Sequence, residues 1–246
     1  MLTGLRHGVR CAIGLTALVV LLAPSSAFAQ ITRVSSSDHR NAVGVTLGGF
    51  FPRGEDGRDD GDVMIADLPD LAFEVNDFNG FSVSGEWLFG LGKYLEGGVG
   101  VGYYKRSVDT VYRDLVNVNN TEIEQTLKFR ISPITASVRF LPVGRGSVEP
   151  YVGVGVGIFN WRWAETGDFV DTSDNSIFPA NYVAKGTSIG PVILAGIRAP
   201  IADAFDVGGE VQFQKATDDI DPSIGLLGNK IDLGGWHALF TMHIRF

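Results

Sequence analysis

The sequence has very little cysteine, little positive charge and, after its first 29 residues, no long apolar run. Its one cysteine is Cys11, so no disulfide can join two parts of the chain. Lysine and arginine total 20 against 28 aspartates and glutamates, a net charge of −8. This balance argues against nucleic-acid binding, which needs concentrated basic charge. No stretch after Ala29 reaches the roughly 18 apolar residues of a transmembrane helix.

The first 29 residues have the pattern of a cleaved export signal. Arg6 and Arg10 precede an apolar run over 11–23, and Ala27-Phe28-Ala29 forms a small-residue cleavage site. The run is too short for a comfortable membrane span of about 20 residues. We expect cleavage before Gln30, with an uncleaved N-terminal anchor as the alternative. Loss of the two arginines would leave 18 basic residues against 28 acidic ones, and no cysteine.

The rest of the chain is rich in strictly alternating segments. In an extended strand over 236–246, one face would carry only Trp236, Ala238, Phe240, Met242, Ile244 and Phe246. The other face would carry His237, Thr241, His243 and Arg245, with Leu239 as its apolar exception. A period of two with one apolar and one polar face is typical of a wall between lipid and a polar interior.

Eight such segments follow one another after residue 40. They cover Asn41–Phe51, Asn79–Gly90, Tyr94–Arg106, Gln125–Phe140, Glu149–Trp163, Lys185–Pro200, Phe205–Ala216 and Leu233–Phe246. The fourth changes phase, because Phe129 and Ile131 have one parity while Ile134 and Val138 have the other. We expect a β-bulge at Ser132-Pro133 that brings both sets to the same face.

The connections between these segments alternate in length. Long ones cover 52–78, 107–124, 164–184 and 217–232, and short ones cover 91–93, 141–148 and 201–204. Long extracellular loops and short periplasmic turns are typical of outer-membrane barrels. We therefore predict an all-β fold, an eight-stranded antiparallel transmembrane β-barrel with up-and-down meander topology. Its organisation would be a signal peptide at 1–29, a periplasmic segment at 30–40 and a barrel domain at 41–246.

One strand and the final residue carry a family resemblance. The strand is Glu149-Pro150-Tyr151-Val152-Gly153-Val154-Gly155-Val156-Gly157, and the final residue is Phe246. Over about 41–246 the chain resembles the small eight-stranded outer-membrane proteins of the OmpA/OmpX/OmpW class, the outer membrane protein β-barrel domain group. The resemblance implies location in the cell outer membrane. It also implies that Phe246 is the assembly signal read by the barrel-assembly machinery.

Parity also predicts which residues face lipid and which face the lumen. The expected lipid belt consists of Val43, Val45, Leu47, Phe81, Val83, Leu95, Val99, Val101, Ile134, Val138, Phe240, Met242 and Ile244. We predict a polar network in the lumen made of Glu86, Glu96, Arg130, Arg139, Arg198, Glu210 and Arg245. The same parity turns Lys128, Gln212, Gln214, His237 and His243 inward.

The predicted network indicates a plugged lumen. Eight strands leave an interior only wide enough to be filled by side chains, and arginine is the preferred partner of a buried carboxylate. A continuous polar conduit is the alternative. Glycines at 98, 100, 102, 153, 155 and 157 either make room for bulky neighbours or line a small hydrophobic cavity. The facing of Tyr151 stays open, as does that of Trp161 and Trp163, which we interpret as membrane-interface aromatics.

These features predict an integral outer-membrane barrel with a structural or surface-interaction role. It would be a monomer in contact with outer-membrane lipids and lipopolysaccharide. Passage of small hydrophobic solutes, as in an OmpW-like channel, is the alternative. A lipid-modifying enzyme is a distant third, because the strand of His237 and His243 carries no serine. We expect no catalytic residue, no cofactor and no metal site, and we interpret the acidic stretch from Glu55 to Asp62 as a solvated loop rather than a calcium site.

Overall fold

A computed structural model describes residues 41–171 and 173–246. The predicted signal peptide, its cleavage site and the periplasmic segment lie outside the described residues. The elements are β1 (Asn41–Pro52), η2 (Glu55–Gly57), α1 (Val63–Asp67), η3 (Val75–Phe78), β2 (Gly80–Gly90), β3 (Leu95–Val116), β4 (Glu122–Phe140), β5 (Glu149–Val170), β6 (Ile177–Ala202), β7 (Phe205–Gln214), β8 (Thr217–Asp219), η4 (Pro222–Ile224), β9 (Lys230–Asp232) and β10 (Gly235–Arg245).

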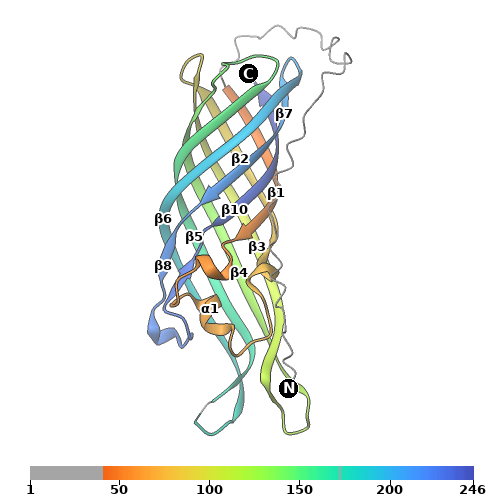
Figure 1. Ribbon diagram of the computed structural model, residues 1–246, viewed down its shortest axis with the longest axis vertical. Helices are drawn as coiled ribbons and strands as arrows, with labels where there is room; N and C mark the ends of the chain where they lie inside the picture. The colour runs from red at the N-terminus through yellow and green to blue at the C-terminus, as the bar shows by residue number, and fades with distance from the viewer. Residues whose placement is uncertain (1–40, 172) are drawn as a thin grey trace, which may run out of the picture. The chain divides into compact units, whose positions relative to one another are not determined.

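Eight of the strands close into an antiparallel barrel, as predicted (Figure 1). Their order around the ring is β1-β10-β7-β6-β5-β4-β3-β2. Each strand pairs with its sequence neighbour in the barrel, and β1 closes the ring by pairing with β10 from Ala42↔Arg245 to Pro52↔Gly235. We call the end where β10 finishes and the short turns lie the inner rim, and the opposite end the outer rim. The asymmetry of small outer-membrane barrels makes the outer rim extracellular.

Strands β3 to β6 run well beyond the other four at the outer rim, at the bottom of Figure 1. Most residues of 107–124 and 164–184, which we predicted to be loops, therefore belong to strands. The β3–β4 connection is a short turn in which Asn120 has φ of 61°, a left-handed conformation that asparagine tolerates. The two long hairpins carry the barrel wall outward beyond the level of the shorter strands.

Strand β4 shows how the wall changes character along its length. Its register with β3 and with β5 is the same on both sides of Ser132-Pro133, so the predicted bulge is wrong. Ile134 faces outward and is half exposed, whereas Phe129 and Ile131 are buried inside the barrel. The phase change therefore marks the place where apolar side chains move from the outer face to the inner face. It marks the point at which the strand leaves lipid.

The lipid-facing belt agrees with the prediction. The outer surface exposes Val43, Val45, Leu47, Phe81, Leu95, Val99, Val101, Ile134, Val138, Phe240, Met242 and Ile244, and Val83 is partly exposed on the same face. A continuous apolar belt of this extent is far larger than the apolar patches that a soluble monomer exposes. The belt therefore requires lipid as its solvent.

A charged residue placed in this belt tests whether the belt faces lipid. Phe240 pairs with Leu47 and is 54% exposed, and Phe240→Arg is expected to lower the free energy of unfolding by about 2–4 kcal/mol if the site lies at the bilayer midplane. Urea unfolding in lipid vesicles measures the change. Val118→Arg, at the fully exposed β3–β4 turn, is the control and should change stability by less than about 0.5 kcal/mol. Equal, near-zero changes in both variants would contradict the assigned facing.

The connection between β1 and β2, residues 53–79, folds into the outer half of the barrel; we call it loop 1. Its buried residues Val63, Met64, Phe73, Val75 and Phe78 form one apolar cluster with side chains of the long strands. The small hairpin of β8 and β9 adds Ile220, Ile231 and Leu233 to the same cluster. Among the described residues, no helix is both long and apolar enough to cross a bilayer.

Candidate functional site

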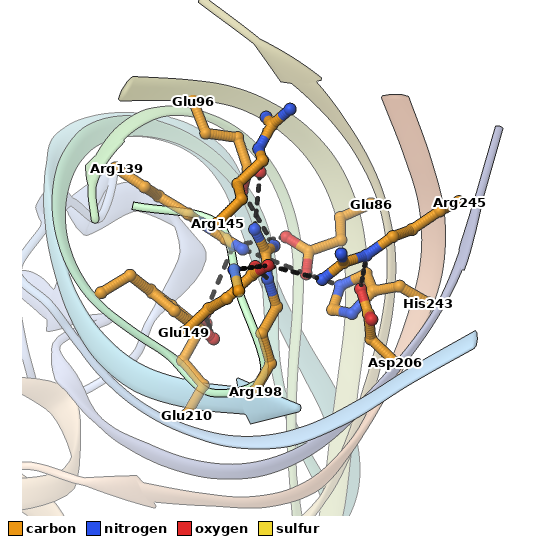
Figure 2. Close-up of polar contacts among 12 residues, drawn as sticks. Glu86, Glu96, Arg139, Arg145, Glu149, Arg198, Asp206, Glu210, His243 and Arg245 are labelled. Atoms are coloured by element: carbon orange, nitrogen blue, oxygen red, sulfur yellow. Dashed lines mark hydrogen bonds and ion pairs between the residues drawn. The ribbon is translucent and has the colours of Figure 1, made fainter. Parts of the chain in front are cut away.

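The inner half of the lumen is filled by charged side chains that point toward one another (Figure 2). We call this group the lumen network; its members are Glu86, Glu96, Arg139, Arg145, Glu149, Arg198, Asp206, Glu210, His243 and Arg245. Every barrel strand except β1 contributes to it. Alternation of side chains along each strand turns these residues inward, while their apolar neighbours face lipid.

Arg198 on β6 is the first centre of the network. Its two terminal nitrogens donate to the two carboxylate oxygens of Glu96 at 2.9 and 2.7 Å, and its Nε donates to Glu149 at 2.8 Å. Glu149 lies directly opposite Arg198 in the β5–β6 register. All three side chains are at most 5% exposed. One guanidinium thus binds two buried carboxylates and meets Glu96 with the paired geometry that makes arginine–carboxylate contacts strong.

Arg139 on β4 is a second centre of the network. It forms ion pairs with Glu86 and with Glu210, the latter at 3.3 Å. The hydroxyl of Tyr151 donates to Glu210 at 2.9 Å, and the Tyr151 ring lies 5.1 Å from the guanidinium carbon of Arg139. On the other side of Glu86, the Nε2 of His243 lies 2.7 Å from a carboxylate oxygen. Together with Tyr151, this half of the network joins five strands.

Two further arginines close the network toward the inner rim. Arg245 forms ion pairs with Asp206 and, at 3.0 Å, with Glu149. Arg145, in the turn between β4 and β5, lies 3.4 Å from Glu96. Five carboxylates therefore face four guanidinium groups and one imidazole, so the cluster nearly balances its own charge. Near-balance is what a buried ionic cluster needs, because an unpaired buried charge is costly.

Six of the seven residues predicted for the network lie together in the lumen, and Arg130 does not. Arg130 and Lys128 lie on the outer face of β4, and Arg130 is exposed. The error follows from the bulge that the strand lacks: without it, the residues before Ser132 keep the opposite facing. Sequence reasoning also missed Glu149 and Asp206, which stand at strand ends where alternation has too few residues to show a facing.

A small chamber lies between the lumen network and the apolar cluster that loop 1 joins. Its volume is about 50 Å³, room for a few water molecules. Gly98, Gly100 and Gly102 line one side of it. On β5 the inward glycines lie against bulky groups: a Cβ at Gly157 would stand 2.4 Å from the ring of Phe159. These glycines make room for neighbouring side chains, and the chamber is smaller than ordinary ligand pockets of about 300 Å³ or more.

Loop 1 closes the lumen above this chamber. Phe78 is fully buried, with its ring centroid 5.4 Å from that of Trp163 and 6.3 Å from that of Phe129. Tyr104 donates from its hydroxyl to the Phe78 carbonyl. Trp161 and Trp163 are buried inside the barrel, so their interpretation as interface aromatics is wrong. They lie beyond the point where apolar residues turn inward, and they pack under loop 1.

The acidic stretch of loop 1 is partly buried, in contrast to the solvated loop predicted from sequence. Asp62 is buried and accepts from Nε of Arg58 at 2.8 Å and from the backbone N–H of Asp232. Arg58 also donates to the Asp232 carbonyl at 2.9 Å. These contacts tie loop 1 to the β8–β9 hairpin. No group of three or more ligating side chains with metal-site geometry occurs in residues 41–171 and 173–246.

A pair of carboxyl groups lies buried beneath α1. Asp67 lies close to Glu165, whose carboxylate accepts from Nε1 of Trp163 at 2.7 Å. Burial, together with the neighbouring Glu165, raises the pKa of Asp67 to about 9. Asp67 is therefore protonated at neutral pH. Ionisation of Asp67 would place an unfavourable negative charge in this buried site of loop 1, close to Glu165.

The packing of loop 1 should weaken as pH rises. Because the pKa of Asp67 is higher in the folded state than the value near 4 of an unfolded aspartate, this stabilisation is complete below about pH 4 and is lost as pH rises through about 9. Asp67→Asn, whose amide is uncharged at every pH, should flatten this dependence of stability on pH. Unfolding followed by tryptophan fluorescence across this range measures it. Asp56→Asn, at an exposed site of loop 1, should retain the wild-type slope; an identical slope in Asp67→Asn would contradict the assignment.

Ser82 and His237 form the nearest approach to a catalytic pair that we find in the described part of the chain. The serine Oγ lies 3.4 Å from Nδ1 of His237, and the other ring nitrogen lies 3.2 Å from the amide oxygen of Gln214. A nucleophile activated in this way needs a close base that is itself oriented by a carboxylate or equivalent acceptor. The serine contact here is long, and both groups face the small chamber. The arrangement fits hydrogen bonding within the lumen.

No protein-family model and no curated protein matches the sequence. Among solved structures, the outer membrane protein OprG from Pseudomonas aeruginosa gives a TM-score of 0.50 at 12% identity, covering 87% of this chain and 99% of OprG. Neisserial surface protein A gives 0.48 at 12% identity, covering 84% of this chain and 96% of that protein. The attachment invasion locus protein Ail of Yersinia pestis gives 0.45 at 8% identity, covering 85% and 100%. With its lipid-facing belt and this fold, the chain is an eight-stranded β-barrel of the bacterial outer-membrane kind.

Proposed function

We propose that this protein is a closed, non-conducting outer-membrane barrel with a structural or surface-interaction role. The observation that carries the proposal is a double closure of the lumen. The ion pairs of the lumen network fill its inner half, and the apolar core of loop 1 fills its outer half. A solute would have to displace both, and the chamber between them holds only about 50 Å³.

The outer hairpins supply the surface for such a role. The tips of the β3–β4 and β5–β6 hairpins are exposed, with Asn119 and Thr121 beside the exposed Val118 on one and the polar residues Asp171, Ser173 and Asp174 on the other. Rigid strands carry these tips away from the membrane, and adaptable polar loops on a rigid scaffold are a common arrangement for binding. We propose that the protein acts as a monomer whose partners meet these tips.

We further propose that Phe246 serves as the assembly signal for the barrel-assembly machinery. Its backbone N–H donates to the carbonyl of Asn41 at 2.9 Å, and its side chain is 56% exposed on the outside of the barrel. An exposed aromatic side chain at the edge of the last strand is accessible to an assembly factor before β10 pairs with β1.

Passage of small hydrophobic solutes is the competing function, and conductance and uptake separate the two. Wild-type protein refolded into planar bilayers is expected to show no steady ion current, and vesicles containing it should not take up hydrophobic solutes faster than empty ones. Glu210→Ala removes a partner of both Arg139 and Tyr151. The lumen of this variant should nevertheless remain closed, because loop 1 still fills its outer half. Glu210→Gln, which retains the hydrogen bond to Tyr151, is the matched control. Steady wild-type conductance would overturn the closed-barrel proposal.

A further inference from the structure

Four basic residues stand side by side on the outer face of the long strands. The strand registers pair Lys105 with Arg130, Arg130 with Arg162, and Arg162 with Lys185, across β3, β4, β5 and β6. All four side chains are exposed. Lys128 lies on the same face of β4, two residues further out, and is partly exposed. We call these five residues the basic row.

The positive charge of the basic row is not balanced by carboxylates of the described residues. None of its members takes part in an ion pair within residues 41–171 and 173–246. Residues directly opposite on neighbouring strands have Cβ atoms about 4.5–5.5 Å apart, and like charges in such positions are destabilising. The chain as a whole is acidic, with only 20 basic residues. Grouping five of them on one face is unfavourable unless an anion neutralises them.

The position of the row relative to the lipid belt is the same on all four strands. Lys105, Arg130, Arg162 and Lys185 each lie four positions beyond an exposed apolar residue. These apolar residues, Val101, Ile134, Ile158 and Ile189, themselves form one register row. Four residues of strand span about 13 Å. Between the two rows, Thr187 donates from its hydroxyl to the side-chain oxygen of Asn160 at 2.8 Å. The outer surface thus passes from apolar to polar to cationic over one short distance.

The row also borders a shallow groove of about 250 Å³. Its lining includes Lys105, Lys128, Arg130 and Arg162, together with Tyr103 and Asn181. Further out on the same face, Asp109 and Glu124 are exposed. The cations therefore lie between lipid on the inner side and carboxylates on the outer side. A long soluble polyanion would meet those carboxylates, whereas a phosphate group anchored in the membrane would not.

We propose that the basic row binds the phosphate groups of a phosphorylated glycolipid of the outer leaflet, with lipopolysaccharide as the occupant. The acyl chains would lie along the row of Val101, Ile134, Ile158 and Ile189, and the phosphates would meet the guanidinium groups of Arg130 and Arg162. Arginine binds phosphate through parallel N–H donors. The groove gives room for the sugar to which the phosphates are attached. The proposal is independent of the closed lumen, because a conducting barrel could carry the same row.

The test uses the full chain in nanodiscs, with lipid retention measured by native mass spectrometry. The probes are phosphorylated lipid A and the same lipid with its phosphates removed. Wild-type protein is expected to retain the phosphorylated lipid about tenfold more strongly, and Arg130→Gln/Arg162→Gln should lose most of this preference. Lys93→Gln/Lys230→Gln removes the same charge at the two ends of the barrel and should keep the wild-type ratio. Circular dichroism verifies that each variant is folded.

Competition experiments show whether the anion that binds the basic row belongs to a membrane lipid or to a soluble molecule. Excess inorganic phosphate or heparin should fail to displace the phosphorylated lipid from the wild-type protein. Displacement by heparin at concentrations below those of the lipid would assign the row to a soluble polyanion and overturn the proposal. An unchanged preference in Arg130→Gln/Arg162→Gln, or equal retention of the two lipids by the wild type, would overturn it as well.

Discussion

Arg198→Met is expected to lower the free energy of unfolding by about 3–5 kcal/mol, the usual cost of removing one partner from a buried ion pair. The side chain of methionine fills similar space but leaves two carboxylates, Glu96 and Glu149, without the group that binds them at 2.7–2.9 Å. Both carboxylates are buried. Urea unfolding of the refolded protein in lipid vesicles measures the change.

Two further variants test whether the loss of stability comes from the contacts of Arg198 with Glu96 and Glu149. Arg145→Met removes an arginine that also faces Glu96, but its side chain is 21% exposed and its contact is 3.4 Å, so the expected loss is below about 1 kcal/mol. Adding Glu96→Gln and Glu149→Gln to Arg198→Met should recover much of the loss, because neutral amides do not need a counter-charge. If Arg198→Met and Arg145→Met unfold at the same urea concentration, the network does not stabilise the barrel as described.

Phe78→Ala is expected to destabilise the packing of loop 1 by about 3–5 kcal/mol, as for other buried phenylalanines reduced to alanine. Phe78 is fully buried between Trp163, Phe129 and Phe73, so its removal leaves a cavity at the centre of the outer closure. The barrel wall does not depend on this contact. The loss should therefore appear as faster proteolysis within 53–79 and altered tryptophan fluorescence, with the strands retained by circular dichroism.

Phe81→Ala is the matched control for this change. The same atoms are removed three residues further along, but from a side chain that is 64% exposed on the lipid face. Proteolysis of loop 1 should then stay at the wild-type rate. If Phe81→Ala and Phe78→Ala accelerate proteolysis equally, loop 1 is not anchored through the Phe78 cluster.

The wall of the barrel could be predicted from sequence because lipid imposes one simple rule on it. Where a strand crosses the bilayer, the side chains that face out are apolar, and most of those that face in are polar or small. In β10, Phe240 and Met242 follow this rule and Leu239 is the exception. The rule fails once a strand leaves the bilayer. Phe129 then turns inward to meet loop 1, and Arg130 turns outward to meet water or headgroups. From sequence periodicity alone, this exchange of inward and outward residues looks the same as a β-bulge.

The side chains that fill the lumen could be predicted only in part, for a different reason. Glu96 and Arg198 lie within long alternating strands, so parity alone places them in the lumen. Glu149 is the first residue of β5 and Asp206 the second of β7, and a facing there depends on how the strand begins. The contacts of loop 1 were beyond prediction, because they depend on which distant side chains the closed barrel places above the chamber.

The seam between β1 and β10 also constrains the order in which the barrel forms. It pairs the two ends of the barrel sequence, Ala42 with Arg245, and contacts between such distant residues form late. Arg245 and His243 reach Glu149 and Glu86 only when β10 is in place. An unclosed sheet of the other seven strands would therefore hold carboxylates on its concave side that lack their partners. Completion of the ring and neutralisation of its interior are a single event, which disfavours a long-lived open intermediate in the membrane.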